Sequence, residues 1–109
     1  MKISVSCAQL LPKLGDRAAN LEKMSAYVEQ IMAEKPGTNL IVFPELMTSG
    51  YEGTPEMFQE LAETLPNGES MQVMGALAKK HHVHIIYGLP ERDPVLTDVL
   101  YNAAVLINS

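Results

Sequence analysis

The chain opens with an alternation of apolar and polar residues. In the segment from Lys2 to Leu10, the apolar side chains of the first half fall on one side of an extended backbone: Ile3, Val5 and Cys7. A period of two residues is the period of a β-strand, in which successive side chains point to opposite faces. The alternation therefore predicts a first strand over residues 2–10.

A helical period begins after Pro12. Asp16 is placed to accept hydrogen bonds from the free amides at the start of a helix that ends near Glu34. The apolar residues of this segment step by three and four: Leu21, Met24, Val28 and Ile31. This spacing predicts an amphipathic helix packed on a sheet, and Pro36 and Gly37 mark its end.

The next apolar run, Leu40–Phe43, is continuous rather than alternating. Continuous apolar strands are typical of parallel sheets that are covered on both faces, so we expect this strand to be central. A strand, a helix and a parallel strand form a βαβ unit, and functional groups in such sheets collect beyond the carboxyl ends of the strands. The segment Pro44–Leu46 occupies that place.

The remainder of the chain predicts two helices and two strands. Thr54 is a cap for a short helix with Pro55 at its first position, and Pro66–Gly68 stops it. Its inward residues are Phe58, Leu61, Ala62 and Leu65, and its solvated face carries Glu56, Glu60 and Glu63. The later elements are a helix over Glu69–His82, a strand over Val83–Tyr87, a loop over Gly88–Asp98 and a strand over Leu100–Ile107. The expected fold is a single α/β unit in the order β-α-β-α-α-β-β.

Composition narrows the classes of function. The 109 residues carry 13 acidic and 8 basic side chains, a formal charge of −5, which is the wrong sign for a phosphate backbone. We therefore expect no nucleic-acid partner. No apolar run approaches the roughly 20 residues that cross a bilayer, so we expect no membrane partner. A single cysteine, Cys7, and the lack of an export signal predict a cytoplasmic protein.

Glu45 is the leading candidate for chemistry. It follows an apolar strand, has apolar neighbours, and lies in a stretch between Lys35 and Lys79 that contains no other lysine or arginine. A carboxylate in apolar surroundings tends to hold its proton more tightly, and such a group serves as a general base or acid near neutral pH. On spacing alone, the sequence favours the alternative that Glu45 is a solvated strand-end residue or a cap for a nearby amide.

Several ordered segments resemble the carbon-nitrogen hydrolase family, usually called the nitrilase superfamily. The resemblance covers nearly the whole chain and rests on these segments: Ala8-Gln9, Pro12, Gly15-Asp16, Asn20-Leu21, Leu40–Leu46, Ser49–Tyr51, Gly88–Glu91 and Tyr101–Ile107. It implies that residues 1–109 are the N-terminal part of one hydrolase domain with a four-layer α-β-β-α sandwich. Family members hydrolyse amides, nitriles and carbamoyl compounds with a glutamate, a lysine and a cysteine, and they commonly form oligomers.

By position in the matching motif, Glu45 corresponds to the catalytic glutamate, and Tyr51 is expected to line the substrate pocket. The resemblance places the lysine and the cysteine after the strand that ends near Ser109, so this chain carries only the glutamate. We therefore expect the isolated chain to be inactive, to need no cofactor, and to form homo-oligomers or to associate through its incomplete sheet. The alternative is a complete, non-enzymatic α/β module that binds a small molecule or a partner.

Other reactive residues have plainer explanations. Cys7 in the first strand is expected to be a buried apolar side chain rather than the nucleophile. Lys79 and Lys80 are expected on the solvated last turn of a helix, where the helix dipole favours cations. The three histidines of the following turn lack the spacing of metal ligands, so no metal is expected there. They are His81, His82 and His84. Asn102 is expected to be buried in its strand with its amide hydrogen-bonded.

Overall fold

The fold is a four-stranded sheet with three helices, seen in a computed structural model that describes residues 1–109. The strands and helices run in the predicted order, β-α-β-α-α-β-β. Their bounds are β1 (Val5–Cys7), α1 (Arg17–Glu34), β2 (Leu40–Val42), α2 (Pro55–Leu61), α3 (Glu69–His81), β3 (His84–Arg92) and β4 (Leu100–Ile107).

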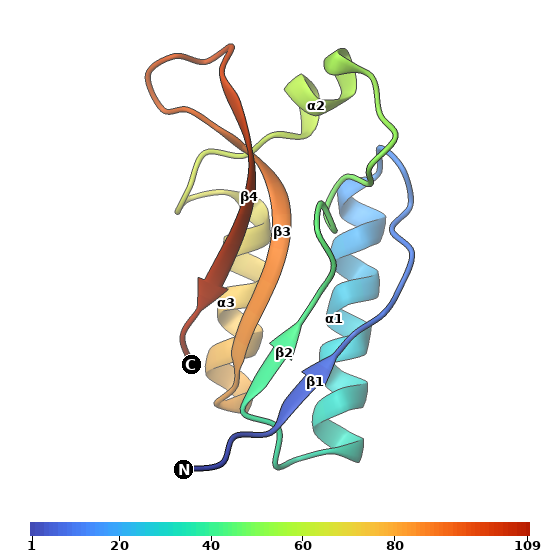
Figure 1. The fold of residues 1–109 in the computed structure, drawn as a ribbon, viewed down its shortest axis with the longest axis vertical. Helices are drawn as coiled ribbons and strands as arrows, with labels where there is room; N and C mark the ends of the chain where they lie inside the picture. Colours follow the sequence, from blue (N-terminus) through green and yellow to red (C-terminus); the bar gives the residue numbers. More distant parts are fainter.

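The sheet has the strand order β1-β2-β3-β4. The first three strands are parallel, so α1 and α3 are crossover helices, while β4 returns antiparallel to β3 (Figure 1). The continuous apolar strand at Leu40 lies between two neighbours, which confirms its predicted central place. The carboxyl ends of the three parallel strands meet at the end of the molecule that α2 occupies (Figure 1).

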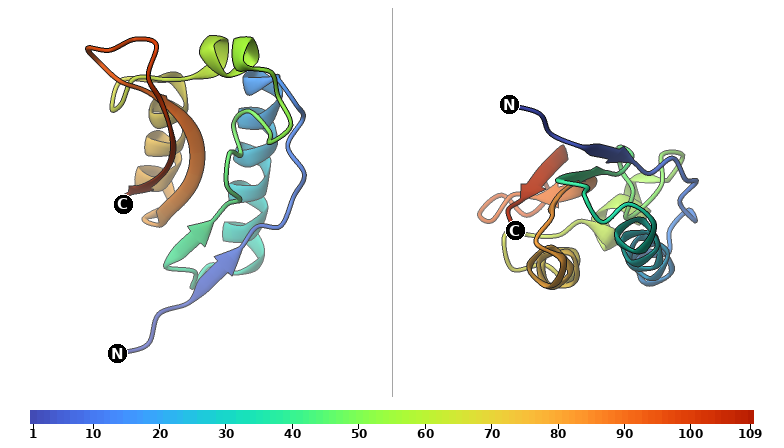
Figure 2. Two further views of the ribbon diagram at one scale, coloured as in Figure 1. Left: turned by 45° about the horizontal axis from the view of Figure 1, so that its top comes forward. Right: turned by 90° about the horizontal axis from the view of Figure 1, so that it is seen from below.

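The two long helices, α1 and α3, cover the same face of the sheet, and the opposite face carries no helix (Figure 2). The core lies between the helices and the sheet, and its largest fully buried side chains include Met24, Val28, Ile41, Met74, Ile85 and Tyr87. On the opposite face, Val5 is 45% exposed and Leu106 is 60% exposed. The chain thus builds one helical layer and one sheet layer.

Helix α1 begins as the sequence predicts. The Asp16 side chain accepts a hydrogen bond from the Ala19 amide at 3.0 Å, and Leu21, Met24 and Val28 are buried against the sheet. The bond to the Ala19 amide holds the pKa of Asp16 below its ordinary value. None of the three helices combines the length and the apolar character needed to span a lipid bilayer.

The third strand is longer than the sequence analysis predicts. The predicted loop over Gly88–Asp98, which contains two prolines, is wrong for residues 88–92, because β3 continues to Arg92. The reason is β4, which pairs with β3 without interruption from Ile85↔Ile107 to Arg92↔Leu100. This long-range pairing overrides the local turn preference of glycine and proline.

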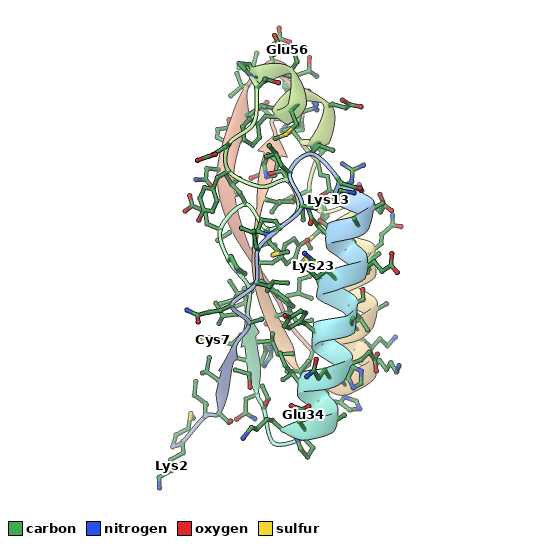
Figure 3. The ribbon with its side chains drawn as sticks, turned by 90° about the vertical axis from the view of Figure 1, so that its right-hand side faces the viewer. Lys2, Cys7, Lys13, Lys23, Glu34 and Glu56 are labelled. Carbon is green, nitrogen blue, oxygen red and sulfur yellow. The ribbon has the colours of Figure 1, made fainter.

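The first strand is shorter than predicted, and its cysteine is exposed. Only Val5–Cys7 pair with β2, and Cys7 lies on the face of the sheet that α1 does not cover (Figure 3). The expectation of a buried Cys7 is wrong because alternation alone does not say which face of a strand is covered.

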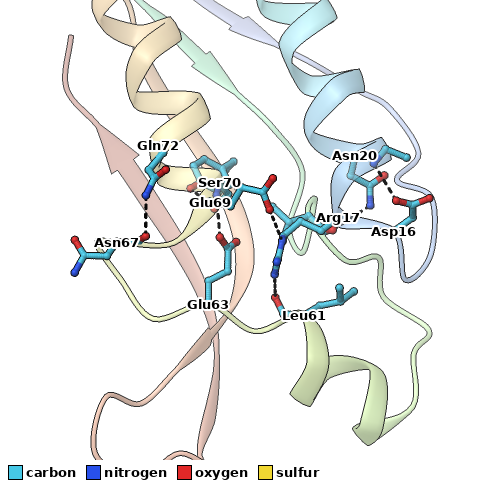
Figure 4. A network of polar contacts seen from close by, with 12 residues as sticks. Asp16, Arg17, Asn20, Leu61, Glu63, Asn67, Glu69, Ser70 and Gln72 are labelled. Atoms are coloured by element: carbon cyan, nitrogen blue, oxygen red, sulfur yellow. Dashed lines mark hydrogen bonds and ion pairs between the residues drawn. The ribbon is translucent and has the colours of Figure 1, made fainter.

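The second helix ends at Leu61, and the predicted solvated position of Glu63 is wrong. The backbone after Leu61 is extended, so Leu65 lies outside the helix and Glu63 forms an isolated bridge with Glu91. Glu63 is only 5% exposed. Its Oε1 accepts a hydrogen bond from the Ser70 amide at 2.8 Å, in the first turn of α3 (Figure 4). Glu63 therefore caps α3 across seven residues.

A hydrogen-bonded pair lies behind this cap. The Ser70 hydroxyl and the Tyr87 hydroxyl are 2.8 Å apart, and both residues are fully buried. Burial raises the pKa of Tyr87 to about 12, so its hydroxyl keeps its proton at neutral pH. The cap thus connects the segment after α2 to α3 and, through Ser70, to β3. The other carboxylate oxygen of Glu63, Oε2, is buried without a partner.

The Glu63 cap predicts a graded loss of stability. Glu63→Ala should lower the free energy of unfolding by about 1–3 kcal/mol, because the buried Ser70 amide loses its acceptor. Glu63→Gln should cost less because a side-chain oxygen remains. Urea denaturation measures both, with Glu60→Ala on the exposed face of α2 as the control. Equal midpoints for Glu63→Ala and Glu60→Ala would show that the cap contributes nothing.

Candidate active site

The turn after β2 is attached by its backbone to β3. The Phe43 amide donates to the Ile86 carbonyl at 2.8 Å, and the Met47 amide donates to the Gly88 carbonyl at 2.9 Å. The Gly88 amide in turn donates to the Pro44 carbonyl at 3.2 Å. These bonds hold the turn, and Glu45 within it, beyond the carboxyl end of the central strand.

The attachment requires a residue without a side chain at Gly88. A Cβ atom there would lie 2.5 Å from the Leu46 amide nitrogen and 2.7 Å from the Glu45 Cα atom, and both of these neighbours are backbone. Leu46 itself has a φ of 47°, a left-handed conformation that is uncommon for residues other than glycine. Close contact with β3 therefore fixes an uncommon turn at the candidate base.

A buried asparagine holds the other side of the turn. Asn20 of α1 is fully buried, and its side-chain amide donates to the Thr48 carbonyl at 3.1 Å. The Gly15 amide donates to the Ser49 carbonyl at 2.8 Å. Asn20 and Gly15 belong to the segments that carry the family resemblance, and both contact the turn that contains Glu45.

The Glu45 carboxylate accepts hydrogen bonds from two neutral side chains. The Tyr51 hydroxyl donates to Oε2 at 3.1 Å, and the Asn102 side-chain amide donates to Oε1. Tyr51 comes from the same loop, whereas Asn102 comes from β4, 57 residues along the chain. Glu45 takes part in none of the four ion pairs of the structure. The carboxylate is thus held by neutral donors rather than by a cation.

Tyr51 is a hydrogen-bond donor at neutral pH. The hydrogen bond to Glu45 raises the pKa of the Tyr51 phenol above its ordinary value, with smaller contributions from burial and from the negative charge of Glu45. The direction follows from the chemistry, because a carboxylate has no proton to donate and disfavours a phenolate beside it.

Glu45 is exposed but borders a cavity. A cavity of about 330 Å³ is lined by Glu45, Asn102, Gly88 and Phe43, among others. A neighbouring cavity of about 400 Å³ shares Asn102 and is bordered by Leu46 and Phe58. Tyr51 lines neither of these cavities and borders a third one, with Leu11 and Leu14. The arrangement gives a carboxylate with two hydrogen-bond donors at the edge of a cavity.

The role of Asn102 differs from the prediction. A buried side chain is expected from the apolar strand, whereas Asn102 is exposed on the uncovered face of β4. Its amide is hydrogen-bonded as expected, but to Glu45. The sequence signal for a specific partner is the asparagine itself within an apolar strand, because asparagine is depleted from strands.

The other reactive residues form no hydrogen bond or ion pair with Glu45. Cys7 borders a cavity that Glu45 does not line, although the two cavities share Phe43. Lys79 and Lys80 are exposed on the last turn of α3, as predicted, and Lys80 and His81 contact Glu29 of α1 at 2.9 and 3.0 Å. No three histidine, cysteine, aspartate or glutamate side chains come close enough together to hold a metal ion.

Comparison with known proteins assigns the family. The model of the family described as carbon-nitrogen hydrolase matches residues 4–109. The chain belongs to the carbon-nitrogen hydrolase family. It is 46% identical over 107 residues to a probable nitrilase of Schizosaccharomyces pombe, a match that covers 98% of this chain and 39% of the relative. It is 34% identical to the omega-amidase NIT3 of Saccharomyces cerevisiae, over 98% of this chain and 37% of that protein.

The fold is also that of the family. The crystal structure of Saccharomyces cerevisiae Nit3, a member of branch 10 of the nitrilase superfamily, superposes with a TM-score of 0.82 at 32% sequence identity. The superposition covers 97% of this chain and 40% of the Nit3 chain. This hydrolase-family chain therefore spans about two fifths of the length of these relatives.

The close approach at Gly88 predicts that one added methyl group destabilises this hydrolase-family chain at that position. Gly88→Ala should lower the free energy of unfolding by about 1–3 kcal/mol, because the added Cβ overlaps the backbone of the Glu45 turn. Gly75→Ala is the matched control: its Cβ has nothing within 4 Å, and it lies in α3, where alanine should stabilise by about 1 kcal/mol. Thermal unfolding of both variants checks the prediction, which fails if they shift in the same direction.

The Tyr51–Glu45 contact predicts a specific titration. Glu45→Gln should lower the pKa of the Tyr51 phenol towards its ordinary value, because the anionic acceptor is lost. NMR of the tyrosine ring Cζ carbons during an alkaline titration measures this shift. Tyr101 is the internal control, since its raised pKa comes from a hydrogen bond to Asp93. A Tyr51 titration that is the same with and without the Glu45 carboxylate would contradict the contact.

Proposed function

We propose that this chain supplies the general base of an enzyme that hydrolyses a non-peptide carbon–nitrogen bond. Glu45 is the base. The observation that carries the proposal is the position of the Glu45 carboxylate, which lies at the edge of a cavity and accepts hydrogen bonds from Tyr51 and Asn102. Glu45 also belongs to the segment that resembles the family's glutamate motif. A carboxylate in a fixed position with a free lone pair is suited to remove a proton from a bound reactant.

The proposed reaction follows the family's glutamate, lysine and cysteine chemistry. Glu45 takes the proton of a cysteine thiol, and the thiolate attacks the carbonyl carbon of an amide or the carbon of a nitrile. With an amide, Glu45 then protonates the leaving nitrogen, ammonia departs, and water hydrolyses the thioester to the acid. With a nitrile, attack and protonation of the nitrogen give a thioimidate, a first water adds to its carbon before ammonia departs, and a second water hydrolyses the thioester. A lysine ammonium stabilises the negative charge that develops on the amide oxygen or the nitrile nitrogen.

The nucleophile and the cation are proposed to come from residues outside these 109. Glu45 is not among the residues lining the cavity of Cys7, although Phe43 lines both cavities, and Lys80 is paired with Glu29 at the end of α3. The isolated chain should accordingly be inactive. Residues beyond the chain are also proposed to cover the open face of the sheet, which would complete the α-β-β-α sandwich, and the family likeness favours a homo-oligomer of the complete enzyme.

The first substrates to test are small amides and nitriles. Relatives of this chain include an omega-amidase and a probable nitrilase, so we choose a matched pair of probes: succinamate and 3-cyanopropionate. Both probes yield succinate and ammonia on hydrolysis and differ only in the carbon–nitrogen bond. The ratio of their rates assigns the complete enzyme to the amidase or the nitrilase type.

Glu45→Gln tests the proposed function in the complete protein encoded with this chain. Ammonia release should fall by about 10²–10⁴-fold, because glutamine cannot accept the thiol proton. Glu52→Gln, an exposed glutamate of the same loop, is the matched control and should leave the rate unchanged. Full activity of the Glu45→Gln variant would remove Glu45 from the mechanism. Turnover by the isolated 109-residue chain would show that the nucleophile lies within it.

A further inference from the structure

We propose that Asn102 is a positioning residue for Glu45, which its side-chain amide orients by donating a hydrogen bond to Oε1. The inference rests on the proposed role of Glu45 as a base. It begins with the direction of the hydrogen bond, which the chemistry fixes: a carboxylate only accepts, so the amide nitrogen of Asn102 must be the atom that faces Glu45.

The antiparallel return of β4 brings Asn102 to this place. In the β3–β4 register, Asn102 lies opposite Pro90, two positions along from the pair of Gly88 with Ala104. Gly88 is also the residue whose backbone contacts the Glu45 turn. The β3 strand therefore holds the backbone of Glu45 on one side and the strand that carries its side-chain partner on the other.

The surroundings of Asn102 indicate a specific role. On β4, the residues that share its uncovered face, Ala104 and Leu106, are apolar. Asparagine is unfavourable in a strand, so an asparagine among apolar residues requires a compensating interaction, and the bond to Glu45 is the only side-chain hydrogen bond that Asn102 makes. Its position is thus explained by Glu45 and not by the packing of the strand.

The two donors of Glu45 differ in rigidity. Tyr51 lies on a loop and is 55% exposed, whereas Asn102 is part of β4, which pairs with β3 along its full length. Groups on strands hold a geometry more closely than groups on loops. Asn102 therefore sets the orientation of the carboxylate. Because Asn102 is a neutral donor, it orients the carboxylate without placing beside it a positive charge, which would weaken the base.

The experiment uses the complete protein, with succinamate as the probe. Asn102→Ala removes the donor, and Asn102→Asp keeps the shape while replacing the donor with an acceptor. The kcat of both variants should fall by about 10²-fold, because a small misplacement of a reacting group costs this much, while KM stays within about threefold. Asn108→Ala, an exposed asparagine just beyond β4, should match the wild type.

Crystal structures of the wild type and Asn102→Ala supply a readout that does not depend on turnover. In the variant, the Glu45 carboxylate should leave its wild-type position while the backbone of the turn at Gly88 stays in place. An unchanged carboxylate, an unchanged kcat, or a loss confined to KM would overturn the role of Asn102. If Glu45→Gln keeps full activity while Asn102→Ala still displaces the carboxylate, the proposed function fails and the positioning role stands.

Discussion

The close approach of two backbones at Gly88 is the constraint on which the candidate site depends. The turn after β2 lies against β3 so tightly that a single Cβ atom would overlap the Glu45 Cα atom and the Leu46 amide. Three backbone hydrogen bonds join the two segments there, and Leu46 takes a left-handed conformation. The carboxylate of Glu45 is therefore presented from a turn that the sheet itself holds, rather than from a free loop.

Parallel topology explains why this turn lies at a cavity. Strands β1, β2 and β3 end at the same edge of the sheet, and α2 and the β3–β4 return surround that edge (Figure 1). The helices cover one face only, so the other face of β4 remains free to carry Asn102 towards Glu45 (Figure 2). The same arrangement that leaves Val5 and Leu106 exposed thus gives the carboxylate its second donor.

Local patterns predicted the elements and the leading candidate, and long-range pairing decided the rest. The helix after Asp16, the central strand at Leu40 and the place of Glu45 at its end follow from periodicity, capping and βαβ topology. The solvated position predicted for Glu63 is wrong because Glu56, Glu60 and Glu63 have helical spacing, whereas α2 ends at Leu61. Asn102 could not be paired with Glu45 because nothing in a single sequence reports a contact across 57 residues.

The donors around Glu45 are neutral, and the proposed mechanism places the positive charge elsewhere in the site. Both oxygens of the carboxylate accept from neutral donors. The two arginines near that end bond elsewhere: Arg17 donates to Glu69 and to the Leu61 carbonyl, and Arg92 donates to Gln59 and to the Thr97 carbonyl. A base held by a cation would be oriented equally well but would release less energy on taking a proton. Under the proposed mechanism, the positive charge belongs instead beside the oxygen that becomes negative on the substrate. The proposed reaction therefore needs neutral donors beside Glu45 and a separate cation beside the oxyanion.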